Sequence, residues 1–335
     1  MALLLEPMQA GALYLKNRLV MPPMATSKAD PEGRVSRAIL DYYDEKSAGG
    51  HIALIITEHS FVSREGQASR NQLSVADDGM AGGLEELAAV IRRNGSKSVA
   101  QINHAGSAAE KDIIGTEPVA PSAVAHPRWH KCVPHELTAE EIKNVVSAFR
   151  DAAVRVKNAG FDGVEIHSAH GYLLSQFFSP LSNKRVDGYG GDVLKRVRIH
   201  LEIIDALRKA LGKDFPILLR LGASDYMEGG ATIEDSLAAV QEFEKAGVDI
   251  LDISGGFCTY TVPGVAGQQG YFAPLTEAIK KTVSIPVILT GGITEAEAAE
   301  QLLAGGKADL IGVGRAILND SVWAKHAVES LGELK

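Results

Sequence analysis

Two histidines and a tyrosine form the cluster of this sequence with the clearest chemical potential. The segment HSAHGY places His167 and His170 three residues apart, and Tyr172 follows two residues later. Two imidazoles at this spacing face one cavity if the chain begins to coil there. Their N–H groups can then hold a carbonyl oxygen and stabilise the enolate charge that develops when hydride adds to an enone. The tyrosine hydroxyl can supply a proton to the other alkene carbon.

The same three residues allow other interpretations. The histidines could bind zinc, but no H-E-x-x-H pattern occurs, and strand alternation is expected to point the nearby Glu165 differently from His167. The histidines could also be structural, with satisfied hydrogen bonds, and Tyr172 could cover the rim of a pocket. We predict an oxyanion-binding pair and no metal site.

Two glycine-containing segments near the C-terminus, TGGIT and GVGRA, are suited to binding a phosphate. Gly291, Gly292 and Gly314 leave room for backbone N–H groups and a helix N-terminus to surround the phosphate oxygens. Arg315 adds a charge-assisted clamp. The alternative is that these glycines form tight turns beside a surface arginine.

Gln101 and Arg220, at the ends of the third and fifth apolar runs, could reach the edge of a flat heterocycle from the interior of the fold. A buried arginine needs an anionic or acceptor partner, because an unpaired buried charge is very costly. A reduced flavin, whose pyrimidine edge becomes anionic, would be such a partner. An ion pair of Arg220 with Glu58 or Glu165 is the alternative.

These polar residues stand at the ends of short Val/Ile/Leu runs that alternate with helix-like segments, the pattern of a parallel sheet buried on both faces. The expected strands span 18–21, 52–58, 98–102, 163–167, 217–221, 250–254, 287–290 and 310–313. Helix-like segments, several opened by a Ser or Thr that can cap them, include 36–47, 138–158, 232–246 and 294–304. Eight strands with intervening helices predict a (β/α)8 TIM barrel, in which working residues follow the strands.

The chain is expected to form one domain over residues 1–335. An open doubly wound sheet is the alternative, but its G-x-G-x-x-G turn is not found after an early strand. Residues 13–15 are expected to form an N-terminal hairpin that closes the bottom of the barrel. Two long loops, 112–136 and 171–191, are expected to stand over the barrel mouth.

Composition restricts the partners of the protein. Of 335 residues, 34 are Lys or Arg and 42 are Asp or Glu, and the formal net charge of −8 argues against nucleic acid and anionic membranes. Cys132 and Cys258 are too few for a disulfide framework or a cysteine metal cage, and are compatible with a reducing compartment. Neither a signal peptide nor an apolar run of roughly 20 residues is found, so we expect a cytoplasmic protein.

Six motifs together resemble one family, and they stand in its order and spacing: NRLVMPPM, QINHAG, IHSAHGYLLSQFFSPLSNKRVDGYGG, LRLGASDY, LTGGIT and GVGRAIL. The chain resembles the Old Yellow Enzyme family, the NADH:flavin oxidoreductases, over nearly all its length and in the short, single-domain form. The resemblance implies noncovalent FMN at the barrel mouth, NADH or NADPH as hydride donor, and a small electron-poor alkene as acceptor.

The resemblance also implies roles for individual residues. Residues implied to hold FMN are Pro23, Met24 and Ala25 with His59 beside them, Gln101 and Arg220 at the polar ring edge, and Gly291, Gly292, Gly314 and Arg315 at the phosphate. Residues implied to bind the substrate and act in catalysis are His167, His170 and Tyr172.

The sequence departs from the family pattern in several places. Ala25 stands where many members have a Cys or Thr beside the flavin, with Thr26 next to it, and His59 stands where a small residue is common. Larger relatives add an iron–sulfur cluster and a second nucleotide-binding domain, neither of which is expected here. No arginine follows Trp323, so a homo-oligomer would have active sites that are each complete within one chain.

Three rival functions share the barrel architecture. A tRNA-dihydrouridine synthase-like enzyme is disfavoured by the acidic charge. An aldolase-like barrel would want a Schiff-base lysine at a strand end, and none of the eight ends carries one. A non-catalytic flavin carrier would have no use for His167, His170 and Tyr172 together.

Overall fold

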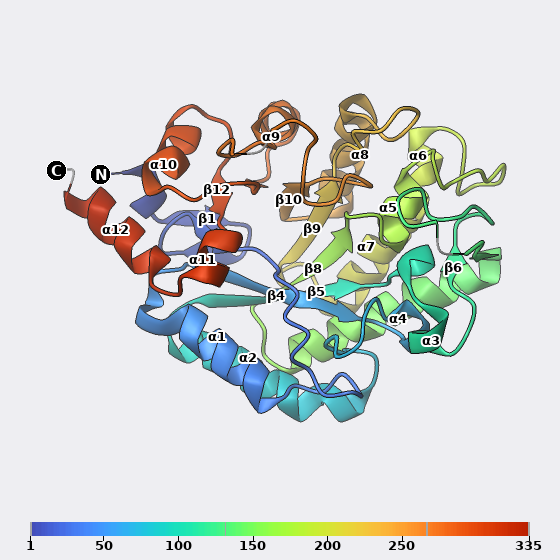
Figure 1. The fold of residues 1–335 in the computed structure, drawn as a ribbon, viewed down its shortest axis with the longest axis horizontal. Helices are drawn as coiled ribbons and strands as arrows, with labels where there is room; N and C mark the ends of the chain where they lie inside the picture. The colour runs from blue at the N-terminus through green and yellow to red at the C-terminus, as the bar shows by residue number, and fades with distance from the viewer. Residues whose placement is uncertain (1, 131, 266, 334–335) are drawn as a thin grey trace.

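A closed barrel of eight parallel strands forms the centre of the protein in this computed structural model, which describes residues 2–130, 132–265 and 267–333 (Figure 1). Around the barrel the strands follow the order β3, β4, β5, β8, β9, β10, β11, β12 and back to β3. Their bounds are β3 Leu19–Met21, β4 Leu54–Phe61, β5 Lys97–Asn103, β8 Gly163–Ser168, β9 Ile217–Gly222, β10 Ile250–Ser254, β11 Val287–Leu289 and β12 Leu310–Gly312. The predicted TIM barrel and its eight strands are confirmed.

Helices surround the strands in Figure 1. The longer ones are α1 Arg37–Ser47, α2 Ala81–Arg93, α4 Ala139–Asn158, α7 Arg198–Leu211, α8 Ile233–Ala246, α9 Ala273–Lys280, α10 Ala296–Ala304 and α12 Trp323–Glu333. Short helices are α3 Lys111–Ile114, α5 Leu173–Phe178, α6 Val193–Arg196 and α11 Arg315–Asn319. Single 3₁₀ turns span Leu3–Leu5, Ala48–Gly50, Arg64–Gly66, Asp78–Met80 and Gly106–Ala108.

Side-chain caps fix where three of the predicted helices begin. The Ser36 side chain accepts a hydrogen bond from the Ile39 N–H at the start of α1, and Thr138 and Thr232 open α4 and α8 with complete capping boxes. The predicted start at Thr294 is wrong. Helix α10 begins at Ala296 after Glu295, which makes no side-chain cap, whereas the Thr294 N–H and hydroxyl are both bound by Gln269.

The N-terminal hairpin closes the bottom of the barrel, as the sequence predicts. Strand β1 (Met8–Ala10) pairs antiparallel with β2 (Leu13–Leu15). The side chains packed together there, from the hairpin and the lower ends of the barrel strands, are Ala10, Leu13, Leu15, Val20, Ala53, Leu54, Ile56, Val99, Leu218, Ile250, Ile288 and Leu310. This apolar plug keeps water out of the lower half of the barrel.

The interior of the barrel changes from apolar to polar towards the carboxyl ends of its strands. Side chains alternate across a strand, so residues two apart share a face. Interior pairs of this kind are Val99 then Gln101 on β5, Leu218 then Arg220 on β9, and Ile250 then Asp252 on β10. A polar chamber therefore lies above the apolar plug, at the end of the barrel where TIM-barrel enzymes hold their substrates.

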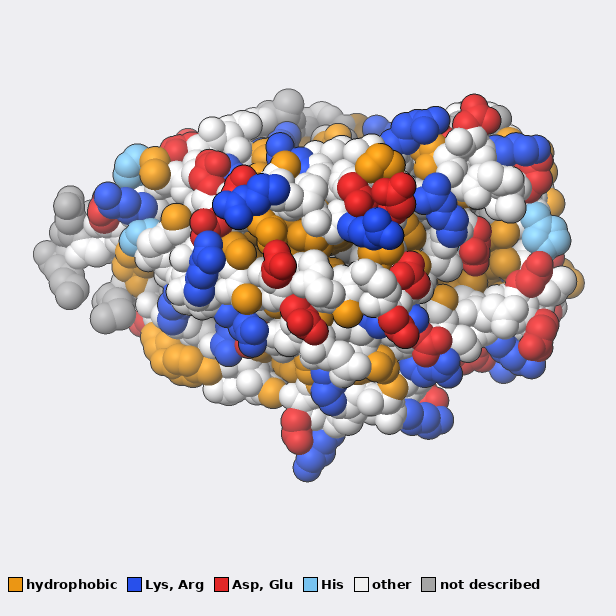
Figure 2. All heavy atoms as spheres, turned by 90° about the horizontal axis from the view of Figure 1, so that it is seen from below, with side chains coloured by type: hydrophobic (Ala, Val, Ile, Leu, Met, Phe, Trp, Pro, Cys, Tyr) orange, Lys and Arg blue, Asp and Glu red, His pale blue; other side chains and the backbone are white. Residues whose placement is uncertain are grey.

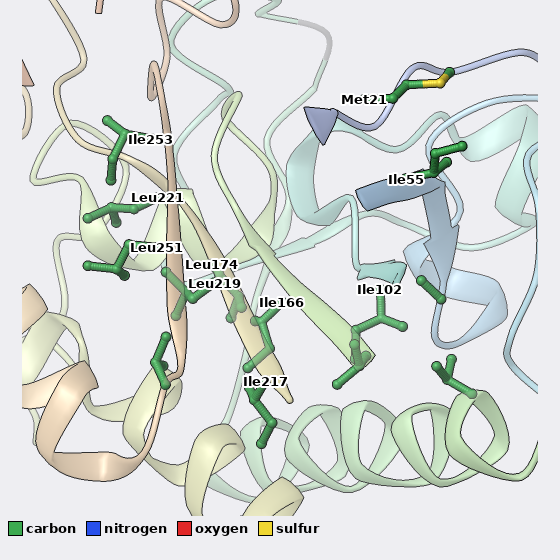
Figure 3. Packing of buried hydrophobic residues seen from close by; sticks show 14 of the residues in the cluster. Met21, Ile55, Ile102, Ile166, Leu174, Ile217, Leu219, Leu221, Leu251 and Ile253 are labelled. Atoms are coloured by element: carbon green, nitrogen blue, oxygen red, sulfur yellow. The ribbon is translucent and has the colours of Figure 1, made fainter. Parts of the chain in front are cut away.

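Outward-facing strand residues form a second, larger core with the helices. Figure 3 shows several of them, including Ile102, Ile166 and Leu219, on neighbouring strands. All three side chains are fully buried. Because this layer holds each strand against its helix, the polar residues on the opposite strand face are set in fixed positions.

The two long segments expected over the barrel mouth behave differently. Segment 112–136 reaches the β10–α9 loop, where the Arg128 guanidinium donates to the carbonyls of Phe257 and Cys258 at 3.4 and 3.1 Å. A second short sheet, β6 (Val119–Ala120) with β7 (His135–Glu136), braces it. Segment 171–191 is not an open loop, because it contains the fully buried helix α5.

The outer surface carries charges of both signs. On the face in Figure 2, acidic and basic side chains are interspersed, with hydrophobic side chains between them. Of the helices in the described ranges, none has the length and apolarity needed to cross a membrane.

Candidate active site

His167, His170 and Tyr172 converge at the end of β8. The ring centroids of the two histidines lie 5.1 Å apart, and the Tyr172 ring lies 5.2 Å from that of His167. His59, near the end of β4, joins them, with its ring centroid 6.2 Å from that of His167 and 5.4 Å from that of Tyr172. The structure thus brings together four of the residues singled out from the sequence.

A turn with left-handed backbone aims these side chains. His170 has φ +60° and Gly171 has φ +75°, and a positive φ is uncommon for a residue with a side chain. The His170 N–H donates to the Gly255 carbonyl at 3.0 Å, and its Nε2 hydrogen-bonds with the Ser254 hydroxyl at 2.8 Å. These contacts hold the turn in its strained form, which is a common feature of functional sites.

The buried imidazoles are neutral near pH 7. Burial lowers the pKa of His167 and of His170 well below the usual value, and neighbouring positive groups, Arg220 among them, lower both pKa values further. A neutral imidazole carries one N–H donor. The Nδ1 atom of His167 is buried without a partner, which leaves its Nε2 as the atom available to a ligand.

Tyr172 keeps its proton over the working pH range. Burial raises the pKa of its hydroxyl to about 12. The Tyr172 hydroxyl has no hydrogen-bond partner in the described part of the chain, although the ring is mostly covered. It is therefore a protonated and available donor.

A layer of buried polar residues lies at and just below the level of His167 on the barrel strands. The Gln101 amide donates to the Glu165 carboxyl at 2.7 Å, and Arg220 Nε lies 3.3 Å from Asp252 Oδ2. Arg220 also stands opposite His167 in the pairing of β8 with β9. The layer therefore places Gln101 and Arg220, the two residues expected at a heterocycle edge, next to the imidazoles.

One expectation and one alternative about this layer are wrong. Glu165 does not point differently from His167, because residues two apart on a strand share a face and both belong to the barrel interior. The ionic partner of Arg220 is Asp252 rather than Glu58 or Glu165. Sequence reasoning missed Asp252, although its parity with Ile250 on β10 was a usable signal.

The two buried carboxyls differ from ordinary surface acids. Burial raises the pKa of Asp252 to about 6, with Arg220 opposing the rise. Burial and the Asp252 charge raise the pKa of Glu165 well above the usual value. Burial and the neighbouring charge thus disfavour the ionised form of Glu165, while Arg220 favours the ionised form of Asp252, which avoids two adjacent buried negative charges.

The first strand of the barrel ends at the same mouth. Pro23 and Met24 are partly buried and Ala25 is exposed, so a flat ligand could lie against them. The Thr26 hydroxyl donates to Glu58 at 2.7 Å, and its N–H donates to the same carboxylate at 3.0 Å. Thr26 is thus bound elsewhere and does not replace the polar side chain that many family members place at position 25.

The glycines after β11 and β12 form a cradle with free donors. Gly291 and Gly292 have φ +110° and +73°. A Cβ on Gly292 would lie 2.4 Å from the Gln268 carbonyl oxygen, so only glycine fits there. Among the described residues, no acceptor takes the N–H groups of Gly291, Gly292 or Gly314. Unpaired backbone donors gathered at one place are what a phosphate group needs.

Arg315 and Tyr271 border this cradle. The exposed Arg315 guanidinium lies 3.4 Å from the Tyr271 hydroxyl, and the Tyr271 ring covers Gly291 and Gly292. The same hydroxyl donates to the carbonyl of Tyr260, whose ring lies 6.2 Å from that of His170. A chain of contacts thus joins the cradle to the histidine cluster.

Over the described ranges, no group of three or more His, Cys, Asp or Glu side chains is placed to hold a metal ion. What the mouth does contain is a glycine cradle with free backbone donors, a polar layer and a cluster of neutral imidazoles with one phenol. The fold and this site define a TIM-barrel protein with a polar, histidine-containing chamber at its mouth and unpaired backbone donors beside it.

The chain belongs to the NADH:flavin oxidoreductase / NADH oxidase family, the Old Yellow Enzyme family, whose model matches residues 3–333. It is 43% identical over 325 residues to an NADH oxidase from Thermoanaerobacter brockii, covering 95% of this chain and 50% of that protein. It is 37% identical over 330 residues to an NADPH dehydrogenase from Geobacillus thermodenitrificans, covering 98% and 94% of the two chains. The chain thus spans about half the length of the first relative.

Solved structures agree with this membership. An old yellow enzyme homologue from Zymomonas mobilis superimposes with a TM-score of 0.85 and 26% identity, covering 98% of this chain and 92% of the other. Morphinone reductase in complex with tetrahydroNAD gives a TM-score of 0.84 and 25% identity, with 98% and 90% covered. Membership implies FMN and a nicotinamide donor, and the free glycine donors and the Arg220 layer fit that cofactor.

Proposed function

We propose that this protein is an FMN-dependent ene-reductase, transferring hydride from NADH or NADPH to the activated C=C bond of an enone or enoate. The observation that carries the proposal is the convergence of His167, His170 and Tyr172 at the end of β8. The alkene half-reaction needs hydrogen-bond donors for the carbonyl oxygen and a proton donor for carbon, and two neutral imidazoles beside one protonated phenol can supply them. The complex of morphinone reductase with tetrahydroNAD supports a nicotinamide donor.

The residues proposed to hold FMN surround the upper chamber. Bound FMN would supply the redox chemistry, taking hydride from the nicotinamide and passing it to the alkene. The residues beside its ring system would be Pro23, Met24, Ala25, His59, Gln101 and Arg220, and those around its phosphate would be Gly291, Gly292, Gly314 and Arg315. The barrel itself positions these groups, since they lie on or just after six of its strands, β3, β4, β5, β9, β11 and β12.

The histidines and the tyrosine would act on the substrate. His167 and His170 would donate to its carbonyl oxygen and stabilise the negative charge that develops there. The hydrogen bond with the Ser254 hydroxyl fixes the ring of His170, and with Nε2 accepting from that hydroxyl the ring would donate to the substrate from Nδ1. Tyr172 would give its proton to the alkene carbon that does not receive hydride, and its raised pKa keeps that proton in place until it is needed.

The proposal predicts a yellow protein that releases FMN rather than FAD on denaturation. Anaerobic addition of NADH or NADPH should bleach the flavin absorption, and addition of an enone should restore it. A colourless protein that cannot be reconstituted with FMN would remove the proposal. A yellow protein that is bleached by nicotinamide but reoxidised by no alkene would support the flavin-carrier alternative.

A second prediction concerns the phosphate cradle. Replacing Arg315 by Ala removes one charge-assisted contact, worth about 1.5 to 3 kcal/mol, so FMN affinity should fall roughly 10-fold to 150-fold. Titration of apoprotein with FMN, followed by fluorescence quenching, measures this. Arg37→Ala, a change at an exposed arginine on α1, is the matched control. Equal affinity in the Arg315 variant and the wild type would place the phosphate elsewhere.

A further inference from the structure

His59 is a third imidazole in the site, next to His167 of the oxyanion pair. The centroid of its ring lies 6.2 Å from that of His167 and 5.4 Å from that of Tyr172. In the described part of the chain its ring makes no contact with that of His170. A carbonyl oxygen has two lone pairs, which the N–H groups of His167 and His170 would fill, so a donor on His59 needs another acceptor.

Gln72 determines which nitrogen of His59 carries the proton. The Ala68 N–H donates to Gln72 Oε1 at 2.7 Å, which identifies the oxygen end of this amide. The nitrogen end therefore faces His59, with Nε2 of Gln72 2.5 Å from His59 Nδ1 and 3.1 Å from the His59 carbonyl oxygen. An amide nitrogen only donates, so Nδ1 accepts and the proton of the neutral ring lies on Nε2.

The loop that carries Gln72 is firmly attached to β4. The Phe61 N–H donates to the Leu73 carbonyl, and the Val75 N–H donates to the Phe61 carbonyl, both at 3.0 Å. Gln72 itself is 2% exposed. Rotating its amide would break the bonds to Ala68 and His59 without access to water, so the Nε2–H form of His59 is fixed in advance.

The Nε2–H group of His59 is available for a ligand. Among the described residues it has no hydrogen-bond partner, and its Nε2 is absent from the buried, unsatisfied atoms of the site. Burial lowers the pKa of His59 to about 4, so the group is a neutral donor near pH 7. A preformed neutral donor in a reaction chamber points to a second acceptor atom on the ligand, in addition to the oxygen that His167 and His170 would hold.

We propose that His59 donates to a second carbonyl oxygen of the substrate, and that Gln72 is the positioning residue for this donor. The inference rests on the proposed ene-reductase function and narrows it to alkenes flanked by two carbonyl groups. One carbonyl would bind His167 and His170, and the other would bind His59 Nε2. Tyr172, which lies between the two sides in ring contact with both His167 and His59, would stay next to the double bond.

Matched ligands test the second donor. Succinimide and 2-pyrrolidinone are unreactive five-membered rings with two carbonyl groups and one, respectively. In the FMN-loaded protein, His59→Leu should weaken succinimide binding about 3-fold to 10-fold, the value of one neutral hydrogen bond, and change 2-pyrrolidinone binding less than 2-fold. His59→Gln, which restores an N–H donor, should recover part of the succinimide affinity. Kinetics with cyclopent-4-ene-1,3-dione against cyclopent-2-enone should show the same selective loss in kcat/KM.

Gln72→Glu tests the positioning role with an almost identical shape. A carboxylate at this place accepts from both Ala68 N–H and His59 Nδ1–H, which moves the imidazole proton to Nδ1 and leaves Nε2 as an acceptor. Imidazole ¹⁵N shifts should report the Nε2–H form in the wild type and the Nδ1–H form in the variant. Succinimide affinity should fall in Gln72→Glu as it does in His59→Leu.

Several outcomes would overturn the inference. An equal loss of affinity for succinimide and 2-pyrrolidinone in His59→Leu would mean that His59 only packs the chamber. A loss of FMN affinity with no selective loss of succinimide affinity would mean that His59 acts only on the cofactor. A His59 ring that carries its proton on Nδ1 in the wild-type protein would contradict the role of Gln72. The ¹⁵N measurement needs no substrate, so it stays decisive even if no alkene reoxidises the protein and the proposed function fails.

Discussion

Replacing His167 and His170 together by Ala should abolish the long-wavelength absorption that phenols produce when bound over the flavin. Alkene turnover should fall by at least about 10²-fold, because removing even one oxyanion donor commonly costs 10² to 10³ in rate. The expectation follows from the neutral state of both rings and from their 5.1 Å separation, which lets them converge on one oxygen. Spectral titration with a phenol and steady-state kinetics with an enone measure the two effects.

Three controls separate this role from others. His326→Ala, at an exposed position on α12, should change neither signal. FMN content and thermal stability of the double variant show whether the chamber stays folded. A chelator should leave wild-type activity intact, and activity lost to chelation would revive the zinc interpretation. Full phenol binding by the double variant would remove the oxyanion role.

The positions of the strands could be predicted because burial on both faces produces short, continuous apolar runs. On β9, for example, Leu219 and Leu221 face the helices while Leu218 faces the barrel interior, so the run ILLRLG contains one polar residue, Arg220. The same alternation, applied strictly, places Glu165 with His167 and Asp252 with Ile250. Those two side-chain directions were therefore within reach of sequence reasoning.

Other features depend on loop geometry that alternation does not determine. Gln72 lies 13 residues after His59, in a stretch without strand or helix periodicity, and its role follows only from the return of this loop to β4. Thr26 could be imagined as a substitute for the side chain missing at Ala25 until its bonds to Glu58 are seen. Contacts of this kind are set by tertiary packing rather than by local pattern.

The polar chamber lowers the stability of the protein when no ligand is bound. Glu165, Asp252 and Arg220 are buried together, and several of their polar atoms have no partner among the described residues. Such an arrangement lowers the free energy of unfolding, because unsatisfied buried groups lose their hydration without gaining a hydrogen bond. It is consistent with a site that completes its hydrogen bonds when a polar ring binds. We therefore expect FMN to raise the melting temperature of the protein.

Tyr172→Phe should slow alkene reduction by about 10² to 10⁴, the range typical of losing a positioned general acid. The variant keeps the ring and its packing against His59 and His167 but removes the hydroxyl proton. Because the hydroxyl has no partner among the described residues, its loss breaks no internal hydrogen bond, and stability should change little. Bleaching by NADH or NADPH should proceed at nearly the wild-type rate, since that half of the reaction uses no proton from Tyr172.

Stopped-flow measurement of the two half-reactions distinguishes the roles that Tyr172 could have. Equal slowing of both halves would assign it to packing, and no slowing of either would assign the proton to water or another donor. The pH dependence gives an independent check. Burial raises the pKa of Tyr172 to about 12, so the acid form persists throughout the neutral range, and the wild-type alkene half-reaction should lose rate only as pH approaches that value. A loss of rate centred near pH 7 would identify a different proton donor.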